Sequence, residues 1–130
     1  MPPSPTPITP LEFGILELAT GTYTATVTSN DGATPIPAAS LLTLTLTLYV
    51  IKTDGTIGYV NSRNAQNVLN ANNVTVDVNG FLTWAIQTLD TTLVEALPFE
   101  RHIALWEWTA TGVAGKHEMV LVVQALTEVP

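Results

Sequence analysis

The run at 41–51, with the sequence LLTLTLTLYVI, constrains the fold more than any other part of the chain. Alternate side chains of an extended strand point to opposite faces, so one face here carries leucine and valine while the other carries threonine and tyrosine. A helix would scatter both sets around its circumference. The run therefore predicts a long β-strand whose apolar face is covered by a second layer: Leu42, Leu44, Leu46, Leu48 and Val50.

Composition predicts one domain with a surface that is poor in charge. The chain has 130 residues, and 12% of them are charged, against about 25% in typical soluble domains. No run reaches the ~18 consecutive apolar residues of a membrane helix, so no membrane partner is expected. The net charge of −7 argues against direct binding to nucleic acid, which needs a basic surface. The absence of cysteine excludes disulfides and is compatible with assembly in a cytoplasm.

Several other segments show strand and turn patterns. Residues 22–29 alternate, Asp54-Gly55 and Asn79-Gly80 are hairpin signals, and 99–109 with 116–125 forms a last strand pair. About seven short strands are counted in this way, which is typical of an immunoglobulin-like antiparallel β-sandwich. The expected fold class is therefore all-β, with one sandwich domain at 11–130.

Four less regular segments receive structural interpretations. Residues 11–18 are expected to be an edge strand or a packed connector, and 62–73 a surface excursion with one or two helical turns. Trp84 shares a face with other apolar residues, so we expect it in the core rather than under a ligand. The side chain of Asp90 is expected to hydrogen-bond to nearby backbone.

Two regions are predicted to contact other subunits. Prolines concentrate in residues 1–10, which should form an extended N-terminal arm, docked on a neighbour or left as a solvated tail. The strand at 99–109 is apolar on both faces, and such strands are covered on both faces, by the arm, a loop or another subunit. The candidate subunit contacts are Pro2, Pro3, Pro5, Pro7, Ile8, Pro10, Leu11, Trp106 and Trp108.

Motifs for catalysis or metal binding are sparse. Glu100 and His102 share one strand face, but a metal site needs at least one more ligand, and no recognisable spacing supplies it. There is no Gly-x-Ser-x-Gly elbow, phosphate-binding glycine loop or dinucleotide fingerprint. We therefore predict no catalytic residue, no metal site and no cofactor, and we expect His102 to be a hydrogen-bonded polar group in or beside the sheet.

Three stretches show a likeness to a known group. They are LTLYVIKTDG at 46–55, VNGFLTW at 78–84 with Leu89-Asp90-Thr91, and ERHIALWEWT at 100–109 followed by GKHE at 115–118. Together they resemble the immunoglobulin-like domains of tailed-bacteriophage virion proteins. The resemblance implies a non-enzymatic structural protein of the virion, assembled in the host bacterial cytoplasm. Members of the group sit on capsids as decoration (cement) proteins, at head–tail junctions, or in baseplates and fibres, and the resemblance does not say which. The sparse charge, the doubly apolar strands and the proline-rich arm favour capsid decoration, with the major capsid protein and further copies of the chain as partners.

Two other classes remain open on the sequence. One is an adhesion or carbohydrate-binding module of a tail, baseplate or fibre, which would need exposed aromatic side chains such as Trp106 and Trp108. The other is a small hydrolase, which would need a catalytic trio that the sequence does not display.

Overall fold

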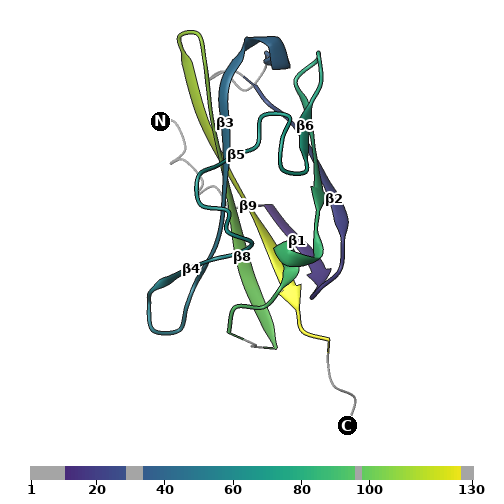
Figure 1. The fold of residues 1–130 in the computed structure, drawn as a ribbon, viewed down its shortest axis with the longest axis vertical. Coiled ribbons are helices and arrows are strands. Elements are labelled where there is room, and N and C mark those ends of the chain that lie inside the picture. Colours follow the sequence, from purple (N-terminus) through teal and green to yellow (C-terminus); the bar gives the residue numbers. More distant parts are fainter. Residues whose placement is uncertain (1–10, 29–33, 96–97, 127–130) are drawn as a thin grey trace, which may run out of the picture.

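The computed structural model describes residues 11–28, 34–95 and 98–126, and shows two β-sheets packed face to face (Figure 1). The expected all-β, two-sheet architecture is confirmed. Helical structure in the described ranges is limited to two short 3-10 turns, η1 (Ala38–Ser40) and η2 (Thr88–Thr91). Neither turn has the length or apolar character needed to cross a membrane.

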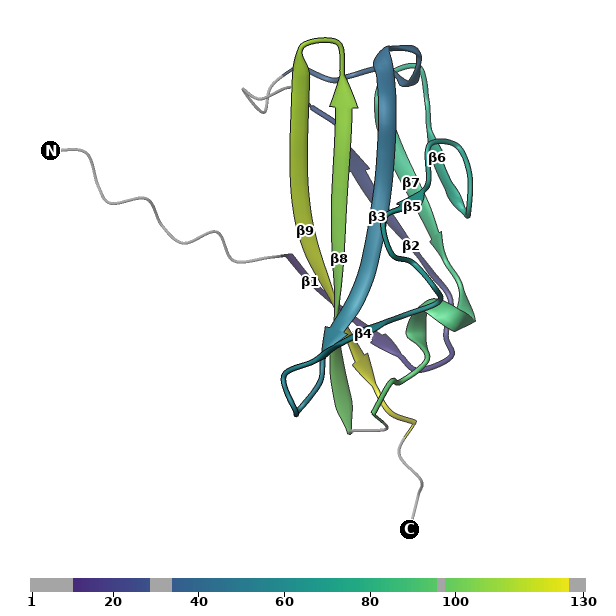
Figure 2. The same ribbon diagram turned by 60° about the vertical axis from the view of Figure 1, so that its left-hand side comes forward.

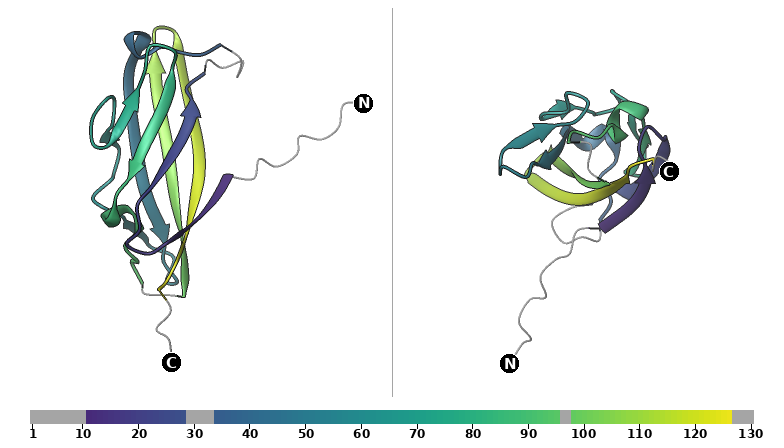
Figure 3. Two further views of the ribbon diagram at one scale, coloured as in Figure 1. Left: turned by 90° about the vertical axis from the view of Figure 1, so that its right-hand side faces the viewer. Right: turned by 90° about the horizontal axis from the view of Figure 1, so that it is seen from below.

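The larger sheet has six strands and the smaller sheet has three. The two layers are seen end-on in the right-hand view of Figure 3. The larger sheet has the order β1-β9-β8-β3-β4, with β5 also paired to β3. Its strands are β1 (Leu11–Leu16), β3 (Leu41–Ile51), β4 (Ile57–Tyr59), β5 (Gln66–Asn67), β8 (Phe99–Ala110) and β9 (Val113–Gln124). The smaller sheet has the order β2-β7-β6, with β2 (Gly21–Thr26), β6 (Val74–Val76) and β7 (Phe81–Ile86).

The topology corrects two details of the prediction. β1 pairs with β9 in parallel, so the sandwich is not purely antiparallel. The two strands come from opposite ends of the chain, and no tight turn forces them to run in opposite directions. The described residues contain nine strands rather than about seven, because short segments such as β5 add pairings that the sequence pattern does not show. The interpretation of 11–18 as an edge strand is confirmed by β1.

The leucine row of β3 lies in the core, with one exception. Leu44, Leu46 and Leu48 are 0% exposed, whereas Leu42 is 63% exposed. The pairing of β3 with β8 shifts register between Leu41 and Thr43. A bulge reverses the alternation of side chains at that point, so Leu41 points inward and Leu42 outward. The placement of Leu42 in the core row was therefore wrong.

Three aromatic rings fill the middle of the sandwich. Trp84 on β7 is 0% exposed, which confirms its core role, and Trp106 on β8 is 2% exposed. The two indoles meet edge to face with centroids 5.4 Å apart, and Tyr23 stacks on Trp106 at 6.2 Å. Both indole N–H groups are buried without a hydrogen-bond partner among the described residues, so these rings contribute by packing.

The asparagine-rich segment passes from the larger sheet to the smaller one. It forms β5 and irregular turns in place of the expected helical turns, so that expectation was wrong. Asn61, Asn70, Asn72 and Asn73 all have positive φ angles, a conformation that asparagine tolerates better than most residues. The asparagines of this segment therefore serve positions where the backbone has a positive φ angle. The segment closes one open side of the sandwich between β4 and β6 (Figure 1).

Both predicted glycine hairpins are present. Gly55 lies in the turn between β3 and β4 with φ +88°, and Gly80 lies in the turn between β6 and β7 with φ +78°. A Cβ atom on Gly80 would lie 2.6 Å from the backbone oxygen of Ile36. Glycine is thus required at position 80 by both conformation and space.

Candidate docking surface and buried polar cluster

Two regions of the molecule concentrate features that could serve a function. The first is a buried polar cluster beside β7, η2 and β8, and the second is the outer face of the larger sheet. The cluster contains Glu100 and His102, the two residues that share a strand face as metal ligands would.

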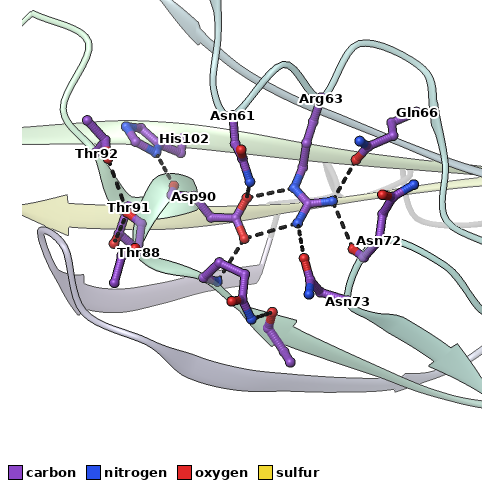
Figure 4. Close-up of polar contacts among 12 residues, drawn as sticks. Asn61, Arg63, Gln66, Asn72, Asn73, Thr88, Asp90, Thr91, Thr92 and His102 are labelled. Carbon is purple, nitrogen blue, oxygen red and sulfur yellow. Dashed lines mark hydrogen bonds and ion pairs between the residues drawn. The ribbon is translucent and has the colours of Figure 1, made fainter.

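Arg63 and Asp90 form the centre of the buried cluster (Figure 4). Their side chains are 1% and 0% exposed, and Arg63 Nε donates to Asp90 Oδ1 at 2.6 Å. Arg63 Nη2 also donates to Asp90 Oδ2 at 3.2 Å. Such a bidentate pair fits the planar fork of the guanidinium group. The guanidinium carbon lies 5.8 Å from the centroid of the Trp84 ring, which adds a cation–π contact.

Every hydrogen-bond donor of the Arg63 guanidinium has an acceptor. Beyond Asp90, the acceptors are Gln66 Oε1 at 2.7 Å, the Asn72 carbonyl at 3.1 Å and Asn73 Oδ1 at 3.4 Å. Asp90 also accepts from the side chain of Asn61 at 2.9 Å and from the backbone N–H of Gln87 at 2.8 Å. These bonds join the asparagine-rich segment to η2, and the last one confirms the predicted backbone role of Asp90. The geometry is that of a structural clamp.

His102 and Glu100 extend the cluster along β8. His102 is 0% exposed, with Nδ1 at 3.0 Å from the Asp90 carbonyl and Nε2 at 2.7 Å from Glu100 Oε1. Both ring nitrogens therefore have partners, which confirms the expected satisfied polar role. The Glu100 carboxylate also accepts the backbone N–H groups of Val94 and Glu95, each at 2.7 Å. Burial acts to raise the pKa of Glu100, but these two amides, together with His102, outweigh it, and the pKa is lowered.

The same contacts show why Glu100 and His102 are poor candidates for metal binding. The described residues contain no group of three or more histidine, cysteine or acidic side chains that could hold a metal ion. Glu100 Oε1, Glu100 Oε2 and both His102 ring nitrogens already have hydrogen-bond partners within the chain. The sequence did not reveal the pair of Arg63 and Asp90, because the two residues are separated by 27 positions and no motif links them.

The outer face of the larger sheet is divided into two halves. Figure 2 shows β9, β8 and β3 side by side in front of β2 and β7. In the half near the β8–β9 turn, Leu42 is exposed, but polar side chains also lie on this face, with Thr43 Oγ1 2.6 Å from Thr109 Oγ1 and Lys116 Nζ 3.7 Å from Glu107 Oε2. In the other half, apolar side chains lie next to one another across the strands.

An apolar row crosses this second half of the face. Tyr59 pairs with Tyr49, Tyr49 with Ile103, and Ile103 with Val120 across four strands, while Ile57 pairs with Ile51 in the neighbouring row. Val120 is 2% exposed, whereas Ile51 is 59%, Ile57 is 52% and Tyr59 is 47% exposed. We define the outer apolar patch as Tyr49, Ile51, Ile57, Tyr59 and Ile103.

A shallow hollow adjoins the outer apolar patch. It has a volume of about 300 Å³, and its lining combines apolar with polar residues: Val50, Ile51, Phe99 and Ile103 with Thr53, Glu95, Glu100 and Arg101. Phe99 is 62% exposed. The patch is therefore an exposed apolar area rimmed by polar groups of the hollow, a feature that marks interaction sites.

The predicted contact residues have mixed positions. Trp106 lies in the core, so its indole is not presented at the surface of this chain. Trp108 is half-buried, and its ring lies against Gly115, where an added Cβ would come within 2.5 Å of the indole. Leu11 begins β1, and its side chain lies outside the described part. The other predicted contacts also lie outside the described residues: Pro2, Pro3, Pro5, Pro7, Ile8 and Pro10.

Comparison with known proteins does not assign a family. A scan against protein-family models finds no match, and a search of curated proteins finds none either. The resemblance to phage virion domains therefore depends on the sequence alone.

Proposed function

We propose that this chain is a non-enzymatic structural protein of a tailed-bacteriophage virion. Its proposed role is capsid decoration: the domain binds the major capsid protein, stabilises the shell and associates with further copies of itself. The virion assignment comes from the sequence resemblance, and the docking role from the outer apolar patch.

The order of the strands supports an immunoglobulin-like assignment of the fold. In immunoglobulin domains, the second, fifth and fourth strands are neighbours in one sheet, and the third, sixth and seventh in the other. The smaller sheet here has the order β2-β7-β6, and the larger sheet contains β3, β8 and β9 as neighbours. With β4 and β5 taken as additions at the edge of β3, these two sets of neighbours correspond. β1 differs, because the first immunoglobulin strand lies in the sheet of the second strand, whereas β1 pairs with β9 in the larger sheet.

The outer apolar patch is the observation that supports docking. Ile51, Ile57 and Tyr59 are about half exposed, and burying a large apolar side chain fully contributes about 1.5–3 kcal/mol. Charged side chains border the patch: the Tyr49 hydroxyl hydrogen-bonds to Glu118, and Glu95, Glu100 and Arg101 line the adjoining hollow. We expect the patch and the adjoining hollow to lie in a contact that buries at least ~1,000 Å² in total.

The chemistry of the buried cluster agrees with a structural role. His102 and Glu100 bond to each other and to backbone groups, so a substrate would have to break these bonds to reach them. Arg63 and Asp90 are likewise fully paired. The alternative role as a carbohydrate-binding module draws no support from Trp106, which lies in the core.

The test is incorporation into particles. A tagged copy of the chain is expressed during growth of the phage that encodes it, capsids and tails are separated, and copies per particle are counted by mass spectrometry. We expect Ile51→Asp to reduce capsid incorporation at least about tenfold, because a buried unpaired carboxylate costs several kcal/mol.

Val78→Asp is the matched control. Val78 is 80% exposed and lies in the turn between β6 and β7, away from the larger sheet, so its incorporation should be unchanged. Thermal melts of both variants check that the fold is intact. Undiminished incorporation of Ile51→Asp would contradict docking through the patch, and recovery of the chain only in tails would contradict the capsid role.

A further inference from the structure

The edge of β9 is paired along only half of its length. β1 pairs with β9 from Met119 to Gln124, and residues 113–118 have no strand on that side among the described residues (Figure 2). On its other side, β9 pairs with β8 along the entire strand. Residues 113–118 therefore form an open sheet edge, and such edges accept an added strand from another chain.

The β1–β9 ladder shows which residues of β9 direct their backbone N–H and C=O groups toward this edge. Glu17 N–H donates to the Gln124 carbonyl at 2.8 Å. In a parallel ladder, every second residue directs both backbone groups toward the neighbouring strand. Odd-numbered residues of β1 therefore face even-numbered residues of β9. Along the open edge, the residues with outward backbone groups include Ala114 and Lys116.

In residues 4–8, before β1, the residues that keep an N–H group are even-numbered, whereas the residues of β1 that bond to β9 are odd-numbered. Pro5 and Pro7 are odd-numbered, so a straight continuation of β1 along β9 would place residues without an N–H donor against the open edge. Ser4, Thr6 and Ile8 are even-numbered and keep their N–H groups. In an extended conformation, segment 4–8 would therefore have its N–H donors on one edge and its proline nitrogens on the opposite edge. Proline occurs in sheets at this kind of position, on an edge strand with its nitrogen toward solvent.

We propose that segment 4–8 of a second copy of this chain adds as a strand to the open edge 113–118 of β9. Thr6 and its even-numbered neighbours then bond to backbone groups such as those of Lys116, while Pro5 and Pro7 face solvent. For the chain's own segment to direct its even-numbered N–H groups toward β9, the continuous β1 strand would need a bulge, and bulges between parallel strands are rare. The inference rests on the proposed function, in which copies of the chain assemble side by side.

The first test measures self-association of the full chain by sedimentation velocity over a concentration series. Thr6→Pro removes a donor that faces β9, and we expect the dissociation constant of the dimer to rise about tenfold. Val78→Ala is the control, because Val78 lies in the turn between β6 and β7, outside both the arm and the β9 edge, and self-association should not change. Equal behaviour of the two variants would overturn the proposal, as would a full chain that remains monomeric.

The second test distinguishes a second copy from the chain's own arm. Amide hydrogen exchange at Ala114 and Lys116 is followed by NMR in the full chain at low and high concentration. We expect exchange to slow as concentration rises, and Thr6→Pro to abolish that slowing. Slow exchange that does not depend on concentration would assign the edge to the chain's own arm and overturn the proposal.

The two proposals fail separately. If Thr6→Pro has no effect while Ile51→Asp still lowers incorporation into capsids, the edge proposal is wrong and the docking function stands. If Thr6→Pro weakens self-association while Ile51→Asp is incorporated normally, the edge proposal stands and docking through the outer apolar patch is wrong.

Discussion

The two faces of the larger sheet are made by the same strands but have different surroundings. On the inner face, Leu46 of β3 and Trp106 of β8 are 0% and 2% exposed against the smaller sheet. On the outer face, Ile51 at the end of β3 is 59% exposed. The comparison suggests that the inner face supplies folding stability and the outer face supplies contacts with partners. Substitutions on the inner face and in the buried cluster should change the free energy of unfolding, and those on the outer face should change assembly.

The largest effect on stability is expected at the buried ion pair. Asp90→Ala leaves the Arg63 guanidinium buried without its main acceptor, and we expect a loss of about 3–5 kcal/mol in the free energy of unfolding. Glu107→Ala is the control on the outer face, where the pair with Lys116 is solvent-exposed at 3.7 Å and should contribute about 0–1 kcal/mol. Urea denaturation measures both, and equal losses would contradict the separation of the two faces.

A second pair of variants compares adjacent residues of β3. Leu46→Ala should cost about 2–5 kcal/mol, because it removes buried methyl groups and leaves a cavity. Thr45→Ala changes the opposite face and should alter stability by no more than ~0.5 kcal/mol. A loss of less than ~0.5 kcal/mol for Leu46→Ala would show that the leucine row is not the inner face.

Glycines offer a third comparison between the faces. In Gly115→Ala, the new methyl group would lie 2.5 Å from atoms of the Trp108 ring, and displacing the indole should cost about 1–3 kcal/mol. Gly14 on β1 has no atom within 4 Å of an added Cβ, so Gly14→Ala should have an effect within ~0.5 kcal/mol. Thermal melts, with tryptophan fluorescence to follow the ring, check both outcomes.

The smallest predicted effect depends on pH. The pKa of Glu100 is lowered in the folded state, so its contribution to stability is present above the unfolded value of about 4.3 and is lost as pH falls through the folded value. Glu100→Gln should therefore lower stability by about 1 kcal/mol at pH 7, and the difference from wild type should shrink below pH 4. Urea titrations between pH 3 and pH 7 measure this. A difference that stays constant with pH would show that the Glu100 charge has no part in the stabilisation.

Much of the fold follows from local patterns in the sequence. The alternation at 41–51 identified β3, and Asp54-Gly55 and Asn79-Gly80 identified two hairpins. The asparagine-rich segment was misread as helical turns because spacing at Ala65, Val68 and Leu69 resembles a helix over one turn. Ala65 itself has a positive φ angle, as do Asn70, Asn72 and Asn73, and the apolar spacing gives no sign of these left-handed conformations.

The candidate sites were less accessible to sequence reasoning. Glu100 and His102 were recognised as neighbours on one strand face, because two positions in a strand separate them. Their link to Asp90, and the link of Asp90 to Arg63, join segments that have no periodic relation. The outer apolar patch combines side chains from β3, β4 and β8, so it could be located only after the register of those strands was known.

The sequence by itself determined which side chains share a face of each strand, because that relation depends only on the two-residue period of an extended backbone. It also determined the phase of the prolines at 5 and 7 relative to the N–H groups at 4, 6 and 8. The tertiary structure alone decided which face of β8 points inward, where β3 bulges, and that Arg63 meets Asp90. Those outcomes depend on pairing and packing between segments distant in the chain, and both faces of residues 99–109 were apolar enough to be buried.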